Sequence, residues 1–450
     1  MGGSVSGGLH EIKESSPRPE PARVISRLMS DSPTLSRAPV YPAEPREILS
    51  DDFLQDPHPL LRELREKHPV ARVGETGVHL LTSWEIIVEA LGREEDFSAN
   101  LTGVLLRDAD GIPTTFDLPV SAGTQVIATA DEPAHARHRN LVRARLIERQ
   151  VAAMEARIRS WTAAELQPLL EQGGGDFVPL AETIPARVIG HLLGLPAADV
   201  RQHRQWAMMG GEMLAGDLDE ARMQGLAEET LAMAVYLSEH LPESVGSDFA
   251  ENKAPTLMEL LSDGVASEAI DPTEAIGIAI VMFGAGGEST SALLGSAIRL
   301  LAQDTSLAER LRREPGEIPA FVEEVLRLEP PFKFHYRSVR RSCELGGFQL
   351  EPGDRLMLLW AAANRDPEVY EDPEELRLDR THPRHHMSFG RGAHFCVGAH
   401  LARLEARIVL EELLRTTQGF TLTNGADVRH ANSIFVRRLA RLPLDLHPAA

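Results

Sequence analysis

The segment FGRGAHFCVG, residues 389–398, holds one of only two cysteines in a chain of 450 residues. Cys396 stands among three glycines, and the stretch AHLARLEARIVLEELL that follows from Ala399 is strongly helix-forming. A cysteine just ahead of a helix N-terminus faces free N–H groups and the positive end of the helix dipole, which both stabilise a thiolate. The sequence therefore predicts an anionic sulfur whose pKa is lowered.

Three kinds of chemistry fit this cysteine. The glycines at 390, 392 and 398 allow a tight turn and let the backbone lie against a large flat group. A zinc site would use His394 and His400 as further ligands, although the chain has no second cysteine pair. A nucleophilic cysteine would need a general base, for which His394 is a candidate. The third possibility is a thiolate bound axially to haem iron.

The composition limits the class of protein. A net charge of -21 argues against a nucleic-acid partner, because phosphates would be repelled. No apolar run has the length of a membrane helix, and the first residues lack a secretory signal. The second cysteine, Cys343, has no evident disulfide partner. We therefore expect a cytoplasmic protein that has no membrane span.

The N-terminal part differs from the rest of the chain. Residues 1–45 are rich in Pro, Ser and Gly and show no periodicity, which predicts a disordered N-terminal extension. Met29 is an alternative start of the protein. Over residues 46–450 amphipathic stretches alternate with short breaks and no low-complexity linker intervenes, so we expect a single domain there.

A second segment, DPTEAIGIAIVMFGAGGESTSALLGSAIRLLAQD, predicts a helix that passes through the core. Asp271 is a suitable N-cap, Pro272 fits the first helical position, and Glu274 follows three residues after the cap. The middle of the segment is apolar on all sides, as expected for a buried helix.

Three glycines and an acid interrupt this apolar helix. Gly284, Gly286 and Gly287 each cost a helix about 1 kcal/mol relative to alanine, which close packing of another helix would explain. Close packing does not explain Glu288, because a buried carboxylate needs partners or a proton-transfer role.

Three other segments carry charge or turns. In FVEEVLRLEPP, Glu324 and Arg327 share one helical face, an arrangement that is most often a weak surface ion pair. GFQLEPGDRLMLLWAAANRDP predicts two short strands joined by a Pro-Gly turn. In HARHRNLVRARLIERQ five arginines accompany one acid, Glu148, which indicates either a solvated face or a docking patch for an acidic protein or an anionic cofactor.

Taken together these segments resemble the cytochrome P450 family of haem-thiolate monooxygenases. FGRGAHFCVG matches the family's cysteine loop, AGGEST its oxygen-activating helix, EEVLR its Glu-x-x-Arg helix, ANRDP with RLDR the segment before the loop, and DEPAHARHRNLV its haem-side helix. GGESTSALLGSAIRLLA and HYRSVR are most similar to a small actinobacterial orphan group. The resemblance implies a mainly α fold with small β-sheets, in a triangular, helix-rich single domain.

The resemblance also implies roles for individual residues. Cys396 is the expected ligand of the haem iron, and Glu324, Arg327 and Arg380 form the expected buried structural network. The expected cofactor-binding residues are His135, Arg139, Ala285, Arg337, Phe389, His394, Cys396 and Gly398. The expected catalytic residues are Glu288, Ser289 and Thr290. Most members have threonine where this chain has Ser289, which keeps the hydroxyl without the methyl that restricts its rotamers, and a register that uses Thr290 is the alternative.

The activity that the resemblance implies is oxidation of a small organic molecule, such as a secondary metabolite, by a monomeric enzyme that contains haem b. Electrons are expected from NAD(P)H through ferredoxin reductase and an acidic ferredoxin docked on the proximal face, near the arginine-rich helix. The alternatives are an oxidative C–C or C–O coupling enzyme, a peroxide-driven relative and a non-catalytic haem sensor. The last two would not need Glu288 and Ser289.

The substrate is expected to touch three segments. By family position they are NLTGVLLRDADGIPTTF, the helix around WAMMGGEML, and PPFKFHYR. Met208, Met209 and Met213 would form an adaptable lid or, more commonly for methionines, occupy ordinary core and surface positions. Lys333 and His335 lead us to expect a substrate with a carboxylate or another acceptor group.

Overall fold

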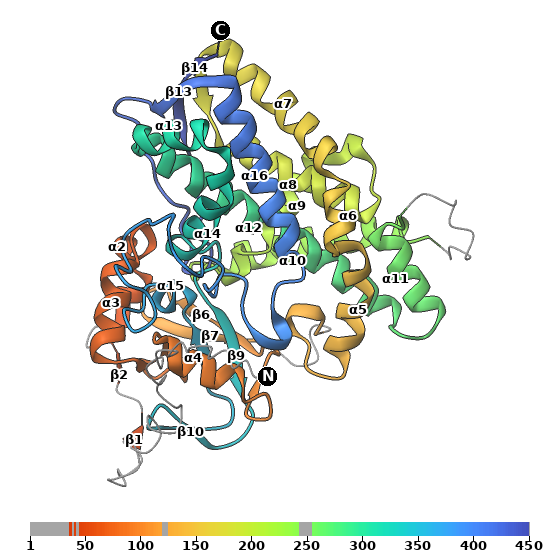
Figure 1. Ribbon diagram of the computed structural model, residues 1–450. Helices are drawn as coiled ribbons and strands as arrows, with labels where there is room; N and C mark the ends of the chain where they lie inside the picture. The colour runs from red at the N-terminus through yellow and green to blue at the C-terminus, as the bar shows by residue number, and fades with distance from the viewer. Residues whose placement is uncertain (1–35, 38–39, 42–44, 119–124, 243–253, 450) are drawn as a thin grey trace, which may run out of the picture.

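The helix α12 (Pro272–Gln303) runs through the middle of the molecule, and the other elements are arranged around it (Figure 1). The computed structural model describes residues 36–37, 40–41, 45–118, 125–242 and 254–449. Asp271 accepts the N–H of Glu274, and the Glu274 carboxylate accepts the N–H of Asp271, so the predicted helix start is confirmed. The helix is long and apolar enough to cross a membrane, but 56% of its most apolar window is buried in the protein, as in a core helix.

The other helices pack beside α12 or lie at the edge of the sheets. They are α2 (Asp51–Gln55), α3 (His58–Lys67), α4 (Trp84–Leu91), α5 (Ala134–Leu146), α6 (Glu148–Ala152), α7 (Glu155–Gln172), α8 (Val178–Leu193), α9 (Val200–Met209), α10 (Glu220–Glu239), α11 (Leu257–Ala266), α13 (Thr305–Arg313), α14 (Ile318–Leu328), α15 (Trp360–Ala363) and α16 (Ala399–Thr416). A large core of buried apolar side chains lies between α12 and its neighbours α8, α9, α14 and α16 and extends to α5 and α7. The predicted mainly helical fold is confirmed.

The strands form small sheets, most of them away from the helical core (Figure 1). The largest has the order β2-β3-β4-β12-β9-β5, from Val40–Tyr41, Val70–Val73, Val78–Leu81, Arg355–Leu358, His335–Val339 and Phe97–Ser98. The smaller sheets are β1-β11-β10 (Ser36–Arg37, Phe348–Leu350, Cys343–Leu345), β13-β14-β8 (Thr417–Leu422, Pro443–Pro448, Gly174–Asp176) and the hairpin β6-β7 (Gly103–Arg107, Pro113–Asp117).

Two expectations about local structure can be compared with these sheets. The two short strands predicted around the Pro-Gly turn exist as β11 and β12, but they belong to different sheets and do not pair with each other. The predicted disordered extension falls mostly on residues 1–35, which lie outside the described part of the chain. Two short described strands also belong to the predicted extension, residues 1–45: β1 pairs with β11, and β2 pairs with β3.

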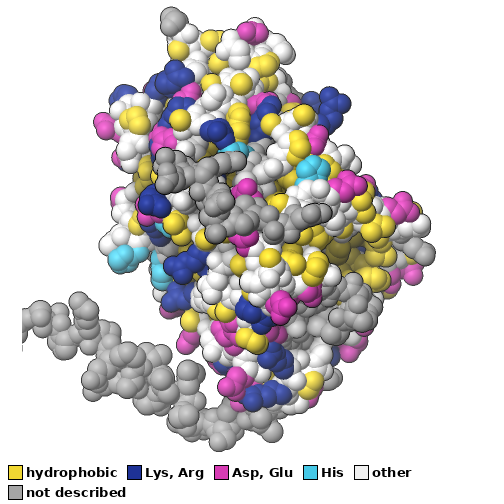
Figure 2. Space-filling model, turned by 90° about the vertical axis from the view of Figure 1, so that its right-hand side faces the viewer, with side chains coloured by type: hydrophobic (Ala, Val, Ile, Leu, Met, Phe, Trp, Pro, Cys, Tyr) yellow, Lys and Arg dark blue, Asp and Glu magenta, His cyan; other side chains and the backbone are white. Residues whose placement is uncertain are grey.

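The surface carries both signs of charge. On the face shown in Figure 2, basic and acidic side chains are interspersed, and apolar ones lie between them singly and in groups. Although the net charge of the sequence is negative, this face does not present one continuous acidic region.

The glycines in the middle of α12 are the points where α8 and α9 pack closely against it. A Cβ atom on Gly287 would lie 2.3 Å from Cβ of Ala207, and one on Gly284 would lie 2.9 Å from Cα of Gly210. Gly286 packs in the same way on a side chain of α8. The helix is unbroken over this stretch, so close packing is the reason for the glycines.

This packing predicts opposite effects of two glycine-to-alanine changes on α12. Gly287→Ala should lower the free energy of unfolding by about 1–3 kcal/mol, because the methyl group overpacks the contact with Ala207. Gly295→Ala is the matched control, since its Cβ would have its nearest neighbour at 3.6 Å, an ordinary contact. The control should be neutral or stabilise by up to about 1 kcal/mol. Urea unfolding of both variants measures the difference, and equal losses of stability would contradict the explanation.

Candidate functional site

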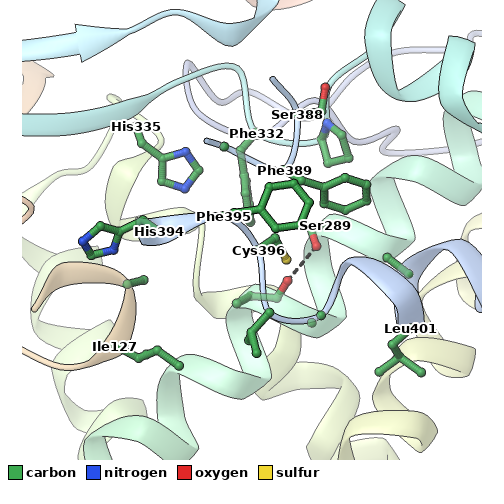
Figure 3. A pocket seen from close by; sticks show the side chains of 18 of the residues that line it. Ile127, Ser289, Phe332, His335, Ser388, Phe389, His394, Phe395, Cys396 and Leu401 are labelled. Carbon is green, nitrogen blue, oxygen red and sulfur yellow. Dashed lines mark hydrogen bonds between the residues drawn. The ribbon is translucent and has the colours of Figure 1, made fainter. Parts of the chain in front are cut away.

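One cavity gathers almost all of the predicted site residues. Its walls come from α12, α5, α16, β9 and the loop that carries Cys396 (Figure 3). The predicted residues that line it are His135, Arg139, Ala285, Ser289, Thr290, Arg337, Phe389, His394, Cys396 and Gly398. Glu288 does not line the cavity, because its side chain points to the other side of α12, toward α9.

The cysteine loop folds as a tight turn. Gly390 and Gly392 have φ angles of +67° and +74°, which favour glycine, whereas Gly398 has an ordinary φ of -88°. The N–H of Cys396 donates to the carbonyl of Phe389 at 2.8 Å, so the two ends of the turn are fixed to each other. The helix α16 begins at Ala399, directly after the loop, as predicted.

The predicted lowering of the Cys396 pKa is wrong for the protein without a bound metal. Burial raises the pKa of the thiol, and the N–H of Gly398 and the charges of Arg139 and Arg403 lower it by less. The sequence argument identified the helix terminus correctly but could not show how far the fold removes the sulfur from water.

A buried carboxylate that sequence reasoning missed ties the cysteine loop to two helices. Glu323 on α14 accepts from Arg403 on α16 at 2.6 and 2.9 Å and bonds to His386, three residues before Phe389, at 2.9 Å. The Arg403 guanidinium also lies 4.5 Å from the Phe389 ring centroid, a cation–π contact. The only signal in the sequence was that the EEVLR segment begins with an acid next to Glu324.

The neighbouring acid holds the chain that leads to the loop. Glu324 accepts from Arg327 at 2.8 and 2.9 Å and from Arg380 at 3.0 Å, and Glu324 and Arg327 are each 1% exposed. Arg327 also donates to the backbone carbonyls of Asn364, Pro373 and Glu375. The pair is therefore a buried network, not the surface ion pair that such spacing most often gives.

Two histidines form the side of the cavity next to α5. The rings of His135 and His394 stack with centroids 4.0 Å apart. His135 bonds to Glu132 through Nδ1 at 2.8 Å, while the buried Nδ1 of His394 has no hydrogen-bond partner. Burial and the Arg337 charge lower the pKa of His394 to about 3.

Two arginines on the cavity wall have no acidic partner. Among the described residues, neither Arg139 nor Arg337 makes a salt bridge, although Arg337 donates to the carbonyl of Tyr336 at 2.8 Å. Burial lowers the pKa of both, that of Arg337 to about 10. A buried guanidinium without a counter-ion is costly, so this part of the cavity fits an anionic group.

Glu288 connects α12 to two distant segments. Its Oε2 accepts the N–H of Gly211, just beyond α9, at 2.7 Å, and its Oε1 accepts from Nε of Arg438 at 3.0 Å. Burial raises the pKa of Glu288 to about 7, and Arg438 and the Gly211 N–H oppose the rise. The acid is therefore able to exchange a proton near neutral pH.

The two hydroxyls after Glu288 both border the cavity. Ser289 Oγ donates to the carbonyl of Ala285 at 2.6 Å, shown dashed in Figure 3, and Thr290 is almost fully buried. Ser289 is thus a hydroxyl on the wall of the cavity and one residue from a buried acid.

The arginine-rich helix α5 divides its charges. Arg139 faces the cavity and Arg145 is buried, while Arg137 lies 3.8 Å from Glu274. Arg143 on α5 and Arg149 on the following helix, α6, are exposed and make no ion pair within the described part of the chain. These two are the arginines left for an external partner.

Only one of the three segments expected to touch a substrate reaches the cavity, through Pro331, Phe332 and His335. Neither β6-β7 nor the end of α9 lines the cavity. At the end of α9, Gly210 packs directly on α12. Met208 and Met209 pack against the helical core and Met213 is exposed, which are ordinary positions for methionines.

The expectation that Lys333 faces a substrate is wrong. Its side chain is 1% exposed, and Nζ donates to the carbonyls of Ser433 at 2.7 Å and Val436 at 3.1 Å. Lys333 therefore fixes the C-terminal loop and points away from the cavity. His335 does line the cavity (Figure 3).

Comparisons with known proteins agree with this geometry. Residues 251–429 match the family model described as Cytochrome P450. The chain is 39% identical over 400 residues to cytochrome P450 144 of Mycobacterium tuberculosis, which covers 87% of this chain and 89% of that protein. It is 32% identical over 294 residues to erythromycin C-12 hydroxylase of Saccharopolyspora erythraea, which covers 64% and 72%.

Solved structures give the same result for the fold. The crystal structure of CalO2 superposes with a TM-score of 0.78 at 26% identity and covers 90% of this chain and 99% of that one. The structure of CYP109E1 from Bacillus megaterium in complex with testosterone gives a TM-score of 0.76 at 27% identity, with 88% and 99% covered.

The pKa of Glu288 predicts how its contribution to stability depends on pH. Because the pKa is about 7 in the folded protein and near 4.5 in the unfolded one, the folded state binds more protons in between, and stability falls as pH rises through 7. Relative to Glu288→Gln, which does not titrate, the wild type should lose about 2 kcal/mol between pH 5 and pH 8. Urea unfolding of both proteins at the two pH values measures this change. A difference that is independent of pH would contradict it.

Proposed function

The chain belongs to the cytochrome P450 family and is an oxidoreductase of the monooxygenase class, and from this premise we propose that it binds haem b through Cys396. We further propose that it takes electrons from NAD(P)H through ferredoxin reductase and ferredoxin and uses O2 to hydroxylate or otherwise oxidise a small organic molecule.

The observation that carries this proposal is the chemistry of the cavity wall. A partly buried thiol shares one cavity with two arginines that have no acidic partner and with a histidine nitrogen that has no hydrogen-bond partner, all among the described residues. Haem b has two carboxylates for the cations, an iron atom for the sulfur and a flat face for the glycine-rich loop. The residues present therefore fit this group.

When bound, haem supplies the activation of O2 from which one oxygen atom enters the substrate. The chain's own residues hold and shield the group. Cys396 would ligate the iron, and Arg139, Arg337, His135 and His394 would receive the carboxylates. Phe389, the first residue of the loop, would pack beside the sulfur and shield it from water.

The protons that the reaction consumes would reach the cavity through two neighbouring residues. Glu288 is buried, has a pKa of about 7 and lies one residue before Ser289, whose hydroxyl borders the cavity. The Arg438 side chain that bonds to Glu288 is 26% exposed, so this ion pair reaches the surface of the protein. Ser289 would take the place that threonine has in most of the family.

The substrate class is proposed from the relatives. Erythromycin C-12 hydroxylase and cyclomarin C epoxidase, at 32% and 30% identity, each modify one secondary metabolite, as their names state. We propose a secondary metabolite as substrate here.

The direct test of haem ligation is the spectrum of the reduced protein with CO. The wild type should show the strongly red-shifted Soret band of a thiolate-ligated haem, and Cys396→Ala should lose it. Cys343→Ala is the matched control, since Cys343 is the other cysteine and lies in β10, outside the cavity. A red-shifted band that survives in Cys396→Ala would overturn the proposal.

The proposed role of Ser289 predicts that its removal lowers the share of NAD(P)H electrons that ends in oxidised substrate. Ser289→Ala should lower the rate of substrate oxidation about tenfold, the effect of one lost hydrogen bond to a charged or strongly polarised group. The share of NAD(P)H electrons that ends as hydrogen peroxide should rise. Thr290→Val, which keeps the shape of its side chain, is the control and should retain most of the coupling. If Thr290→Val uncouples the enzyme and Ser289→Ala does not, Thr290 is the acting hydroxyl.

The exposed arginines predict where an acidic ferredoxin docks. The double change Arg143→Glu with Arg149→Glu should weaken ferredoxin binding about tenfold at low ionic strength, and added salt should shrink the effect. Arg201→Glu, an exposed arginine on α9, is the matched control. Equal weakening by the control would show that only net charge matters and that the surface of α5 and α6 is not the docking site.

A further inference from the structure

The ion pair between Glu323 and Arg403 places two opposite charges beside the cysteine loop. Arg403 Nε donates to Glu323 Oε1 at 2.6 Å, and Arg403 Nη2 donates to Glu323 Oε2 at 2.9 Å, which makes the pair bidentate. The Glu323 side chain is 4% exposed and that of Arg403 is 17% exposed, so water screens the two charges only weakly. The proposed function gives these charges no role.

The third member of this cluster, His386, is neutral. Burial opposes ionisation of Glu323, but the hydrogen bonds from His386 and Arg403 outweigh it and lower the pKa of the acid to about 2. A carboxylate only accepts, so Nε2 of His386, 2.9 Å from Glu323 Oε2, carries a hydrogen. Nδ1 of the same ring accepts the N–H of Ser388 at 3.3 Å and therefore carries none. The buried cluster thus contains one negative and one positive charge.

The positive member of the pair faces the cysteine loop. The Arg403 guanidinium lies 4.5 Å from the ring centroid of Phe389, the first residue of the loop. The carbonyl of Phe389 accepts the N–H of Cys396, and both residues line the cavity (Figure 3). The charges of Arg139 and Arg403 both act on the Cys396 sulfur. Arg403 differs from Arg139 because a carboxylate of the protein neutralises it.

We propose that the pair of Glu323 and Arg403 sets the reduction potential of the haem held by Cys396. A positive charge near the sulfur favours iron that has gained an electron, and a negative charge disfavours it. In the wild type Glu323 cancels most of the charge of Arg403 and so keeps the potential low. Both are positioning residues, because they act through the loop and its sulfur. The proposal rests on the proposed function, since it takes Cys396 as the haem ligand.

Two variants separate charge from packing of the loop. Glu323→Gln keeps the size of the side chain and leaves Arg403 as a lone cation. Adding Arg403→Met removes that cation and keeps an unbranched side chain over Phe389. Glu412→Gln is the matched control, because Glu412 is a buried carboxylate that accepts from Arg159 at 2.7 Å and does not line the cavity. It lies on α16, as Arg403 does, about 13 Å further along the helix axis.

The measurement is spectroelectrochemical titration of the haem-loaded proteins at pH 8, with a CO spectrum of each to confirm that the thiolate stays bound. A unit charge about 10 Å away, at an effective dielectric constant of about 20, changes such an equilibrium about tenfold. Glu323→Gln should therefore shift the iron about tenfold toward the reduced form, a rise of about 59 mV for one electron. The double variant should return to the wild-type potential, and Glu412→Gln should keep it.

Two results would overturn the proposal. One is a double variant whose potential is raised as much as that of Glu323→Gln or more, because a loosened loop that admits water would then be the whole effect. The other is an unchanged potential in Glu323→Gln.

If Glu323→Gln does not bind haem, Arg403→Met alone decides the question. It leaves the carboxylate without its guanidinium, so the potential should fall, and a rise or no change contradicts the proposal. A wild type without a thiolate-type CO spectrum is a separate outcome that would refute the proposed function itself.

Discussion

Two adjacent carboxylates on α14 hold the loop that carries Cys396, and the rest of the site depends on them. Glu323 joins His386 to Arg403 on α16, and Glu324 joins Arg327 to Arg380. Through Arg327 the second network also fixes the backbone at Asn364, whose side chain bonds to the N–H of Met387 and the hydroxyl of Ser388. Removing one partner of such a buried pair costs about 3–5 kcal/mol, so the loop is fixed before any ligand binds.

Within this frame the cavity carries positive charge without a protein counter-ion. Arg139 and Arg337 have no acidic partner and Nδ1 of His394 has no hydrogen-bond partner, all within the described part of the chain. On the opposite side of α12 the charge is balanced, because Glu288 meets Arg438 and the N–H of Gly211. One side of α12 therefore faces a cavity that fits an anionic group, and the other side carries Glu288, an acid that can exchange a proton near neutral pH. Both depend on the close packing that the glycines of α12 permit.

The sequence predicted the parts of the site that are local. The cysteine loop, the capped start of α12 and the buried acid after its glycines were visible because spacing and residue type are sufficient to identify them. Contacts between distant segments were not visible. The partners of Glu288 lie 77 and 150 residues away, and those of Lys333 about as far, at 100 and 103, so nothing near Lys333 showed that its ammonium turns away from the cavity. The raised pKa of Cys396 was missed for the same reason, since burial is a property of the whole fold.

The central claim is that Cys396 is the protein ligand of a haem iron in this cavity. X-ray absorption at the iron edge of the purified haem-loaded protein tests it most directly, because it identifies the atoms bound to iron without a substrate or a redox partner. The account predicts one sulfur atom in the iron coordination shell of the wild type, and none in Cys396→His. An iron shell of nitrogen and oxygen alone in the wild type would contradict it.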